Sequence, residues 1–219
     1  MLGLLARLER RRTEASLLDR VLLSPGEGTS SPAEVTVDAA IQSGHLRVLP
    51  GTAITDEVPI TSAGVRVIDA RTVHDRSAPR RGLDALELEA SWPRARRTEP
   101  GDVIFCASPR PAAIVDHDGL SAVAAPARIL RCAPGSGVVP EAVAGAINAL
   151  PERSPRWRAW RVPLVPVGEA EVLRTALRHL ADQEDQARQR LSELRELAHE
   201  LTHGVARGAM TLRPTEEGH

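Results

Sequence analysis

With 219 residues, the chain is long enough for one ordinary domain and an extension. Hydrophobic residues make up 42% and charged residues 26%, which are globular values, and every apolar run is interrupted well before the ~20 residues that a membrane span requires. The net charge of -1, with arginine in place of all lysine, excludes a polycation, so any nucleic-acid surface must be a local patch.

The first segment, residues 1–23, is expected to form a short amphipathic helix. Apolar residues recur at helical spacing between charged ones, and Ser24-Pro25-Gly26 supplies a stop. The apolar run of residues 2–6 precedes the arginine cluster at residues 10–12, which is the reverse of a secretory signal. We therefore expect a cytoplasmic protein without a membrane anchor, with a linker at residues 25–32.

Residues 33–167 are expected to form an α+β domain with a mixed, irregular sheet. Short apolar runs punctuated by Gly and Pro predict strands at Val35–Val37, Leu46–Leu49, Gly64–Ile68, Val103–Cys106, Ala113–Val115, Ser121–Ala124 and Arg128–Leu130. Val138–Leu150 is expected to be a helix, and Ser154–Pro166 an extended segment that closes the domain.

The clearest hairpin predicted is Ala113–Ala124. Gly119 lies between its two apolar runs and can supply the positive φ of a tight turn. Asp116-His117-Asp118, just before this glycine, is interpreted as part of the turn rather than as a metal site. Cys106 and Cys132 lie in strand-like text and are too few for a disulfide framework, so buried thiols are expected.

A long helix is predicted to follow, at residues 168–208, with a flexible tail at 209–219. Residues 169–203 contain no Gly or Pro, and a continuous helix of this length spans about 50 Å at about 1.5 Å per residue. Positions alternating in steps of four and three form a heptad seam, with Glu184 as a polar interruption: Leu173, Leu177, Leu180, Glu184, Ala187, Leu191, Leu194, Ala198, Leu201 and Val205. The expected partner-binding residues are Leu173, Leu177, Leu180, Leu191, Leu194 and Leu201.

The order of these parts resembles a known family. A strand-rich region, the Glu99-Pro100-Gly101-Asp102 turn into a strand, a helix, Val162-Pro163-Leu164-Val165-Pro166 and a long helix follow one another over residues 33–212. This is similar to the target-recognition domain and following helix of DNA specificity subunits from Type I restriction-modification systems, and to the C-terminal specificity region of some bacterial N-6 adenine DNA methylases.

The resemblance implies a non-catalytic module that reads double-stranded DNA for an adenine DNA methyltransferase subunit or domain, as a homodimer or hetero-oligomer joined through the long helix. The chain departs from the family by carrying one recognition unit instead of two. It also has Glu169–Val172 where the family usually shows a Glu-Gln pair. These departures leave open a free-standing half-subunit and a fragment of a larger methylase.

Methyl transfer by this chain is not expected, and neither is a cofactor. The chain has no glycine-rich loop for S-adenosylmethionine and no Asn/Asp-Pro-Pro-aromatic element for a flipped base, since its one asparagine, Asn148, precedes Ala149 and Leu150. A catalytic partner is therefore implied, and no catalytic or metal-ligating residue is assigned.

Two other functions stay open. His199-Glu200-Leu201-Thr202-His203 matches H-E-x-x-H, whose histidines can bind Zn²⁺ from one helix face, but a hydrolase needs a third ligand and few residues follow. The other alternative is a coiled-coil interaction scaffold that binds no DNA.

Arginines cluster in loop-like text at three places, where guanidinium groups could contact phosphates and guanine edges. The first surrounds Trp92-Pro93, the second interleaves with Trp157 and Trp160, and the third is Ser108-Pro109-Arg110-Pro111. The alternative is a solvated surface in which arginine stands for lysine. The candidate DNA-contacting residues are Arg76, Arg80, Arg81, Arg94, Arg96, Arg97, Arg110, Arg156 and Arg158.

Overall fold

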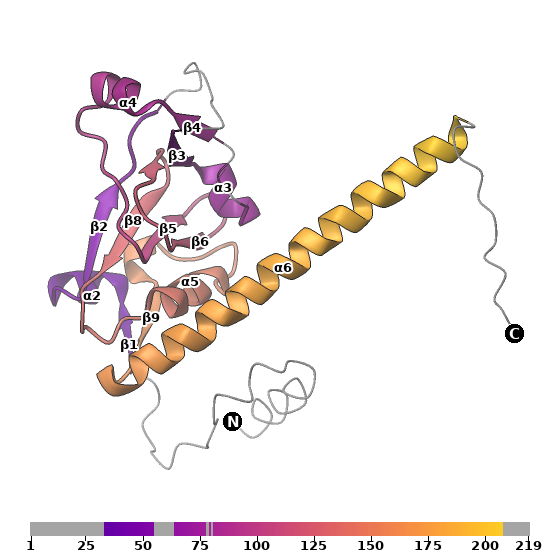
Figure 1. Ribbon diagram of the computed structural model, residues 1–219. Coiled ribbons are helices and arrows are strands. Elements are labelled where there is room, and N and C mark those ends of the chain that lie inside the picture. Colours follow the sequence, from indigo (N-terminus) through magenta and orange to yellow (C-terminus); the bar gives the residue numbers. More distant parts are fainter. Residues whose placement is uncertain (1–32, 55–63, 78, 80, 208–219) are drawn as a thin grey trace, which may run out of the picture. The chain divides into compact units, whose positions relative to one another are not determined.

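The computed structural model describes residues 33–54, 64–77, 79 and 81–207 (Figure 1). The chain divides into a globular unit, Met1–Leu177, and a helical unit, Arg178–His219. The helix expected at residues 1–23, the linker at 25–32 and the tail at 209–219 lie outside the described residues. The architecture is α+β, as the sequence predicts.

The centre of the globular unit is a four-stranded antiparallel sheet in the order β2-β8-β5-β6. Its strands are β2 (Leu46–Pro50), β8 (Arg128–Cys132), β5 (Asp102–Cys106) and β6 (Ala112–Asp116). All five residues of β5 are buried. Successive side chains of a strand point to opposite faces, so β5 contributes to two apolar cores.

The first core lies on the face of Val103 and Phe105. It is covered by α2 (Val37–Gln42), α5 (Pro140–Asn148) and the 3-10 helix η2 (Trp157–Ala159). The Phe105 ring packs 5.7 Å from both Trp157 and Trp160, measured between centroids. A two-stranded sheet of β1 (Ala33–Thr36) and β9 (Arg161–Leu164) borders this face.

The edge strand β6 is paired by a side chain. Asn148 Nδ2 donates to the Ala113 carbonyl at 2.9 Å, and the Ala113 amide donates to Asn148 Oδ1 at 2.9 Å. The side-chain amide of Asn148 thus makes the two hydrogen bonds that a neighbouring strand would make, and it joins α5 to the sheet. The only asparagine of the chain is therefore structural.

The second core lies on the face of Ile104 and Cys106, under α3 (Ala70–Asp75). Beside it stands a three-stranded sheet, β4-β3-β7, formed by β4 (Arg81–Leu83), β3 (Val65–Ile68) and β7 (Ala122–Val123). A third core joins this sheet to α4 (Ala85–Ser91) through Leu88. The single irregular sheet expected from the sequence is therefore three separate sheets.

The predicted hairpin at Ala113–Ala124 is wrong. Strand β6 pairs with β5, whereas β7 runs parallel to β3 in another sheet. Gly119 does have the expected positive φ, +73°. The chain leaves the turn toward β3 because the Ser121 amide donates to Thr98 Oγ1 at 2.8 Å, a long-range contact that alternation of apolar residues cannot reveal.

Three short helices, α2, α3 and α4, were not predicted, and Val37, expected in a strand, begins α2. Each begins after a capping side chain, Thr36, Asp69 or Asp84, that accepts a hydrogen bond from the first turn. Helices of six or seven residues are too short to show a helical apolar period. The segment expected to be extended, Ser154–Pro166, contains η2 before β9.

The long helix α6 runs from Val167 to Ala206, 40 residues or about 60 Å at 1.5 Å per residue. A long C-terminal helix is present, as predicted. No helix in the described part of the chain is long and apolar enough to cross a membrane. The expected thiols are buried at Cys106 and half-buried at Cys132.

Candidate functional site

The loop between α4 and β5 carries the first arginine cluster and is fixed at both ends. Trp92 packs against the third core, and its Nε1 donates to the Ala53 carbonyl at 3.0 Å. At the other end, Thr98 is buried. Residues 93–97 between these two points therefore form a short, tethered loop. We call residues 92–98 the arginine loop.

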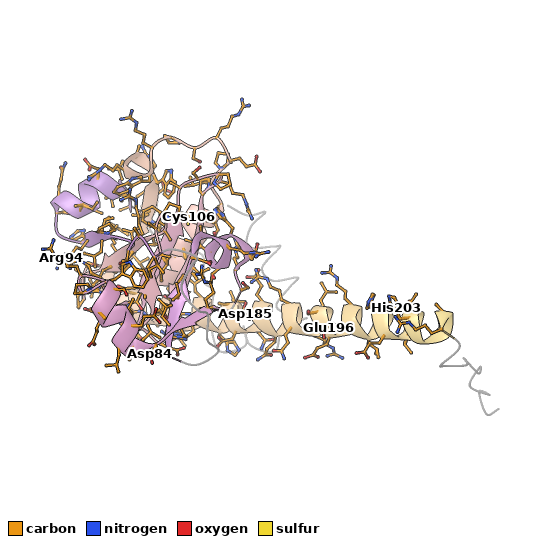
Figure 2. All side chains as sticks on the ribbon, turned by 90° about the horizontal axis from the view of Figure 1, so that it is seen from above. Asp84, Arg94, Cys106, Asp185, Glu196 and His203 are labelled. Carbon is orange, nitrogen blue, oxygen red and sulfur yellow. The ribbon has the colours of Figure 1, made fainter. Side chains whose placement is uncertain are left out.

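Arg94 and Arg96 are the exposed cations of the arginine loop. Their side chains make no ion pair or hydrogen bond with residues that the structure describes, and Figure 2 shows Arg94 at the outer edge of the globular unit. Arg97 is half-buried, and its Nη1 donates to the Leu120 carbonyl at 3.4 Å. The loop thus presents two guanidinium groups to solvent and uses the third in the fold.

A buried network connects the arginine loop to the turn that follows β6. Thr98 Oγ1 donates to Asp116 Oδ2 at 2.6 Å and accepts from the Ser121 amide at 2.8 Å. The main chains of the two loops also pair, through the Thr98 and Leu120 amides. The arginine loop and the turn at residues 116–121 therefore form one fixed surface element.

Arg66 holds the Asp116-His117-Asp118 turn. Its Nη1 donates to Asp118 Oδ2 at 2.6 Å, and its Nη2 donates to the Gly119 carbonyl at 2.9 Å and to Asp116 Oδ1 at 3.3 Å. The triplet forms a turn, as interpreted from the sequence. Nowhere in the described ranges do three or more His, Cys, Asp or Glu side chains gather as a metal site.

Leu120 stands out on the same turn. Its side chain is 74% exposed, and its φ of +61° is a conformation that non-glycine residues rarely adopt. A left-handed residue costs about 1–2 kcal/mol, and the hydrogen bonds to Thr98 and Arg97 hold it there. Sequence reasoning missed this residue because only its place after Gly119 distinguishes it.

The Glu99-Pro100-Gly101-Asp102 turn directly follows the arginine loop, and Arg131 contacts both. Arg131 binds Asp102 with two hydrogen bonds, from Nε at 2.9 Å and from Nη2 at 2.7 Å, and also binds Glu99. The hydrogen bond to Asp102 is the main cause that raises the pKa of Arg131 above its usual value. Arg131 Nη2 also donates to the Arg97 carbonyl at 3.4 Å, so this ion pair fixes the end of the arginine loop.

Arg110 lies in the exposed turn between β5 and β6. Its Nη2 donates to the His74 carbonyl at 3.3 Å, and His74 Nε2 lies 3.2 Å from the Ser108 carbonyl oxygen. This turn therefore rests against the C-terminal end of α3. Arg110 is exposed, and its hydrogen bond to the His74 carbonyl positions it against α3.

The candidate arginines nearest α3, Arg76 and Arg81, are partly buried. Arg76 ends α3 with a φ of +47° and is half-buried. Arg81 Nη1 lies 3.8 Å from Asp69 Oδ2, and its side chain is only 18% exposed. Arg80 lies outside the described residues.

The second arginine cluster surrounds Trp157. The Arg158 guanidinium lies 4.8 Å from the ring centroid of Trp157, and its Nη1 binds Asp38 Oδ1 at 2.7 Å. Arg156 is exposed. Trp157 packs against the first core, whereas Trp92 and Ala95 of the arginine loop pack against the third core, so the two arginine clusters lie against different cores.

The seam of α6 changes in exposure along the helix. Leu173 and Leu177 are half-buried in the globular unit. The remaining expected partner-binding leucines are exposed at Leu180, Leu191, Leu194 and Leu201, by 45%, 48%, 56% and 40%. Glu184 of the seam pairs with Arg188 one turn later. The described helix therefore carries an uncovered apolar stripe.

Burial disfavours the thiolate form of both cysteines. Burial raises the pKa of Cys106 to about 11, with Asp69 adding to the shift. Burial also raises the pKa of Cys132 to about 12, helped by Asp102 and Glu141. A thiol, not a thiolate, is present in both cases.

Comparison with known proteins finds similarity in three-dimensional structure. No protein-family model and no curated protein matches the chain. The HsdS subunit from Thermoanaerobacter tengcongensis is 14% identical, with a TM-score of 0.47 over 95% of this chain and 56% of that one. A chain from a structure of a type I R-M system is 14% identical, with a TM-score of 0.46 over 94% of this chain and 53% of that one. The chain spans about half the length of these two proteins.

Proposed function

We propose that the chain is a recognition module for double-stranded DNA that acts with an adenine DNA methyltransferase subunit or domain. The arginine loop is the observation that carries the proposal. Arg94 and Arg96 are exposed, have no described partner, and belong to a loop tethered by Trp92 and Thr98. The backbone of a fixed loop loses little conformational entropy when its arginines bind phosphates.

The anchoring of the arginine loop also supports binding of DNA through a fixed local surface rather than through long-range electrostatic attraction. With a net charge of -1, the chain gains little long-range attraction to DNA, so binding must come from a local surface. The turn that carries Leu120 is joined to the arginine loop by the Thr98–Asp116 hydrogen bond. This surface can therefore present cations and an apolar group together, at fixed positions, to a duplex.

The long helix supports a partner. Leu191, Leu194 and Leu201 are 40–56% exposed on one seam of α6, and a helix of about 60 Å does not bury such a stripe by itself. A second helix covering this seam by heptad packing would attach the module to its catalytic partner. The chain has no motif for S-adenosylmethionine, so methyl transfer belongs to that partner.

Binding to labelled duplex DNA, measured by fluorescence anisotropy, tests this function. We expect weak, salt-dependent binding of the full chain to any duplex, and a sequence preference once an adenine methyltransferase from the same genome is added. The single strands of the same duplex serve as controls. If the chain binds a helical protein partner through the seam but no duplex, alone or with that partner, it is a coiled-coil scaffold and the proposal is wrong.

A further inference from the structure

His199 and His203, near the end of α6, are not used by the proposed function. They lie one helical turn apart, and their ring centroids are 4.3 Å from each other with the rings tilted by 65°. Both residues are exposed, and neither side chain forms a hydrogen bond or ion pair with the described part of the chain. Two imidazoles are therefore free to share a ligand on one face of the helix. Figure 2 shows His203 near the end of α6.

These histidines lie on the side of α6 away from its apolar seam. The seam positions are Ala198 and Leu201 in this region, the a and d positions of the heptad. His199 then takes position b and His203 position f, which point outward when a and d face a partner helix. A helix packed on the seam would leave both imidazoles accessible.

We propose that His199 and His203 form a two-ligand site for a divalent transition-metal ion that prefers imidazole, such as Zn²⁺ or Ni²⁺. Histidines at positions i and i+4 of a helix can bind one ion from the same face. Because no three donor side chains gather anywhere among the described residues, the remaining coordination positions belong to water. The ion is therefore exchangeable and open to solvent, unlike the closed tetrahedral site of a structural zinc.

Metal binding at this place stabilises the last turns of α6. Only the helical conformation holds the two imidazoles one turn apart, so the ion binds the folded helix and shifts the equilibrium away from fraying. Amide hydrogen exchange near residues 196–207 should therefore become slower when zinc is present. This effect does not depend on DNA binding or on a methyltransferase.

Glu200 is not a ligand of the proposed site. In an H-E-x-x-H hydrolase the glutamate acts on metal-bound water and its loss removes activity, while the two histidines hold the ion. The water-completed site needs only the two imidazoles. The variant Glu200→Gln should therefore bind zinc as tightly as the natural chain does.

The experiment is calorimetric titration of the full chain, carrying no histidine tag, with ZnCl₂ and separately with NiCl₂. We expect one ion per chain, and an affinity that falls more than about tenfold, or about 1.4 kcal/mol, in each of His199→Ala and His203→Ala. Glu200→Gln is the matched control. Circular dichroism of all variants without metal checks that α6 is formed. Amide hydrogen exchange near residues 196–207, measured with and without zinc, tests the same two histidines independently.

Three results would overturn the assignment. One is the absence of saturable binding up to about 1 mM metal, where the binding free energy is only about 4 kcal/mol. Another is unchanged affinity in both alanine variants with α6 intact. The third is one ion per two chains with a doubling of mass, which would mean that the ion is held by ligands from two copies.

Discussion

Thr98 Oγ1 donates a 2.6 Å hydrogen bond to Asp116 Oδ2, and both residues are buried. This bond joins the arginine loop to the turn at residues 116–121. Asp116 also accepts from the Gly119 amide at 3.1 Å and from Arg66 at 3.3 Å. This buried carboxylate, with partners from several segments, therefore joins the segments that form the proposed DNA-binding surface.

Replacing this hydroxyl should weaken the globular unit. The change Thr98→Val keeps the shape and leaves Asp116 Oδ2 without its donor, which costs about 1–3 kcal/mol for a buried acceptor. Urea unfolding measures the loss. As a control, Thr202→Val removes an exposed hydroxyl that donates to the Ala198 carbonyl, and should change stability by less than about 0.5 kcal/mol. Equal effects of the two variants would contradict the role of Thr98.

Leu120 should respond to substitution through its backbone. Glycine adopts a φ of +61° without strain, whereas alanine does not. We therefore expect Leu120→Gly to be more stable than Leu120→Ala by about 1 kcal/mol, as measured by thermal unfolding. If alanine is the more stable of the two, the left-handed conformation is not strained.

The sequence predicts the sheet-forming segments well and their pairing poorly. Strands β2, β3, β5, β6, β7 and β8 match apolar runs because a buried strand has to be apolar. The pairing of β7 with β3 depends on contacts such as Thr98 with Ser121, 23 residues apart. No local pattern contains such information, so the hairpin at Ala113–Ala124 was predicted instead.

The candidate site could be predicted only in part, because exposure and ion pairing, like strand pairing, depend on long-range contacts. Clusters of arginine mark loops, and Arg94 and Arg96 do lie exposed in one. Burial and pairing depend on tertiary structure, so Arg81 near Asp69 and Arg158 on Trp157 could not be told apart from them. Arg66 and Arg131, which hold the two turns, stand alone in strands and carry no cluster signal.

The cysteines should react slowly with thiol reagents. The pKa values of Cys106 and Cys132 are raised to about 11 and about 12, so the thiolate is scarce until the pH approaches these values. We expect almost no reaction of the folded chain with a thiol-specific disulfide reagent at neutral pH, and two reactive thiols in denaturant. Fast reaction of Cys106 in the folded chain would show that the second core opens readily.

The seam of α6 should control association. Leu191→Glu together with Leu194→Glu places charges on the apolar stripe and should abolish self-association or methyltransferase binding, as measured by sedimentation. The fold of the globular unit should be unchanged, because both leucines lie beyond Leu177. The matched control, Gln189→Glu with Ser192→Glu, adds the same charge at outer positions f and b. A monomeric natural chain that binds no methyltransferase helix would contradict this prediction.

The arginine loop should supply most of the affinity for DNA. Replacing the two exposed arginines Arg94 and Arg96 by Ala should weaken binding to every duplex by a similar factor, because phosphate contacts carry no sequence information. Each lost contact should lower the slope of log K against log salt by about 0.9. The slope, measured by anisotropy over a series of salt concentrations, counts the contacts directly.

The chain offers a control of equal charge next to a different core. Arg153 and Arg156 are exposed in the segment just before Trp157, which packs against the first core, and their replacement by Ala should leave the salt slope nearly unchanged. Arg110→Ala should instead weaken some sequences more than others, if this side chain reaches a guanine edge. Should the Arg153 and Arg156 variant lose more affinity than the Arg94 and Arg96 variant, the DNA surface lies near Trp157. The recognition function would then survive, while the placement of its site would be wrong.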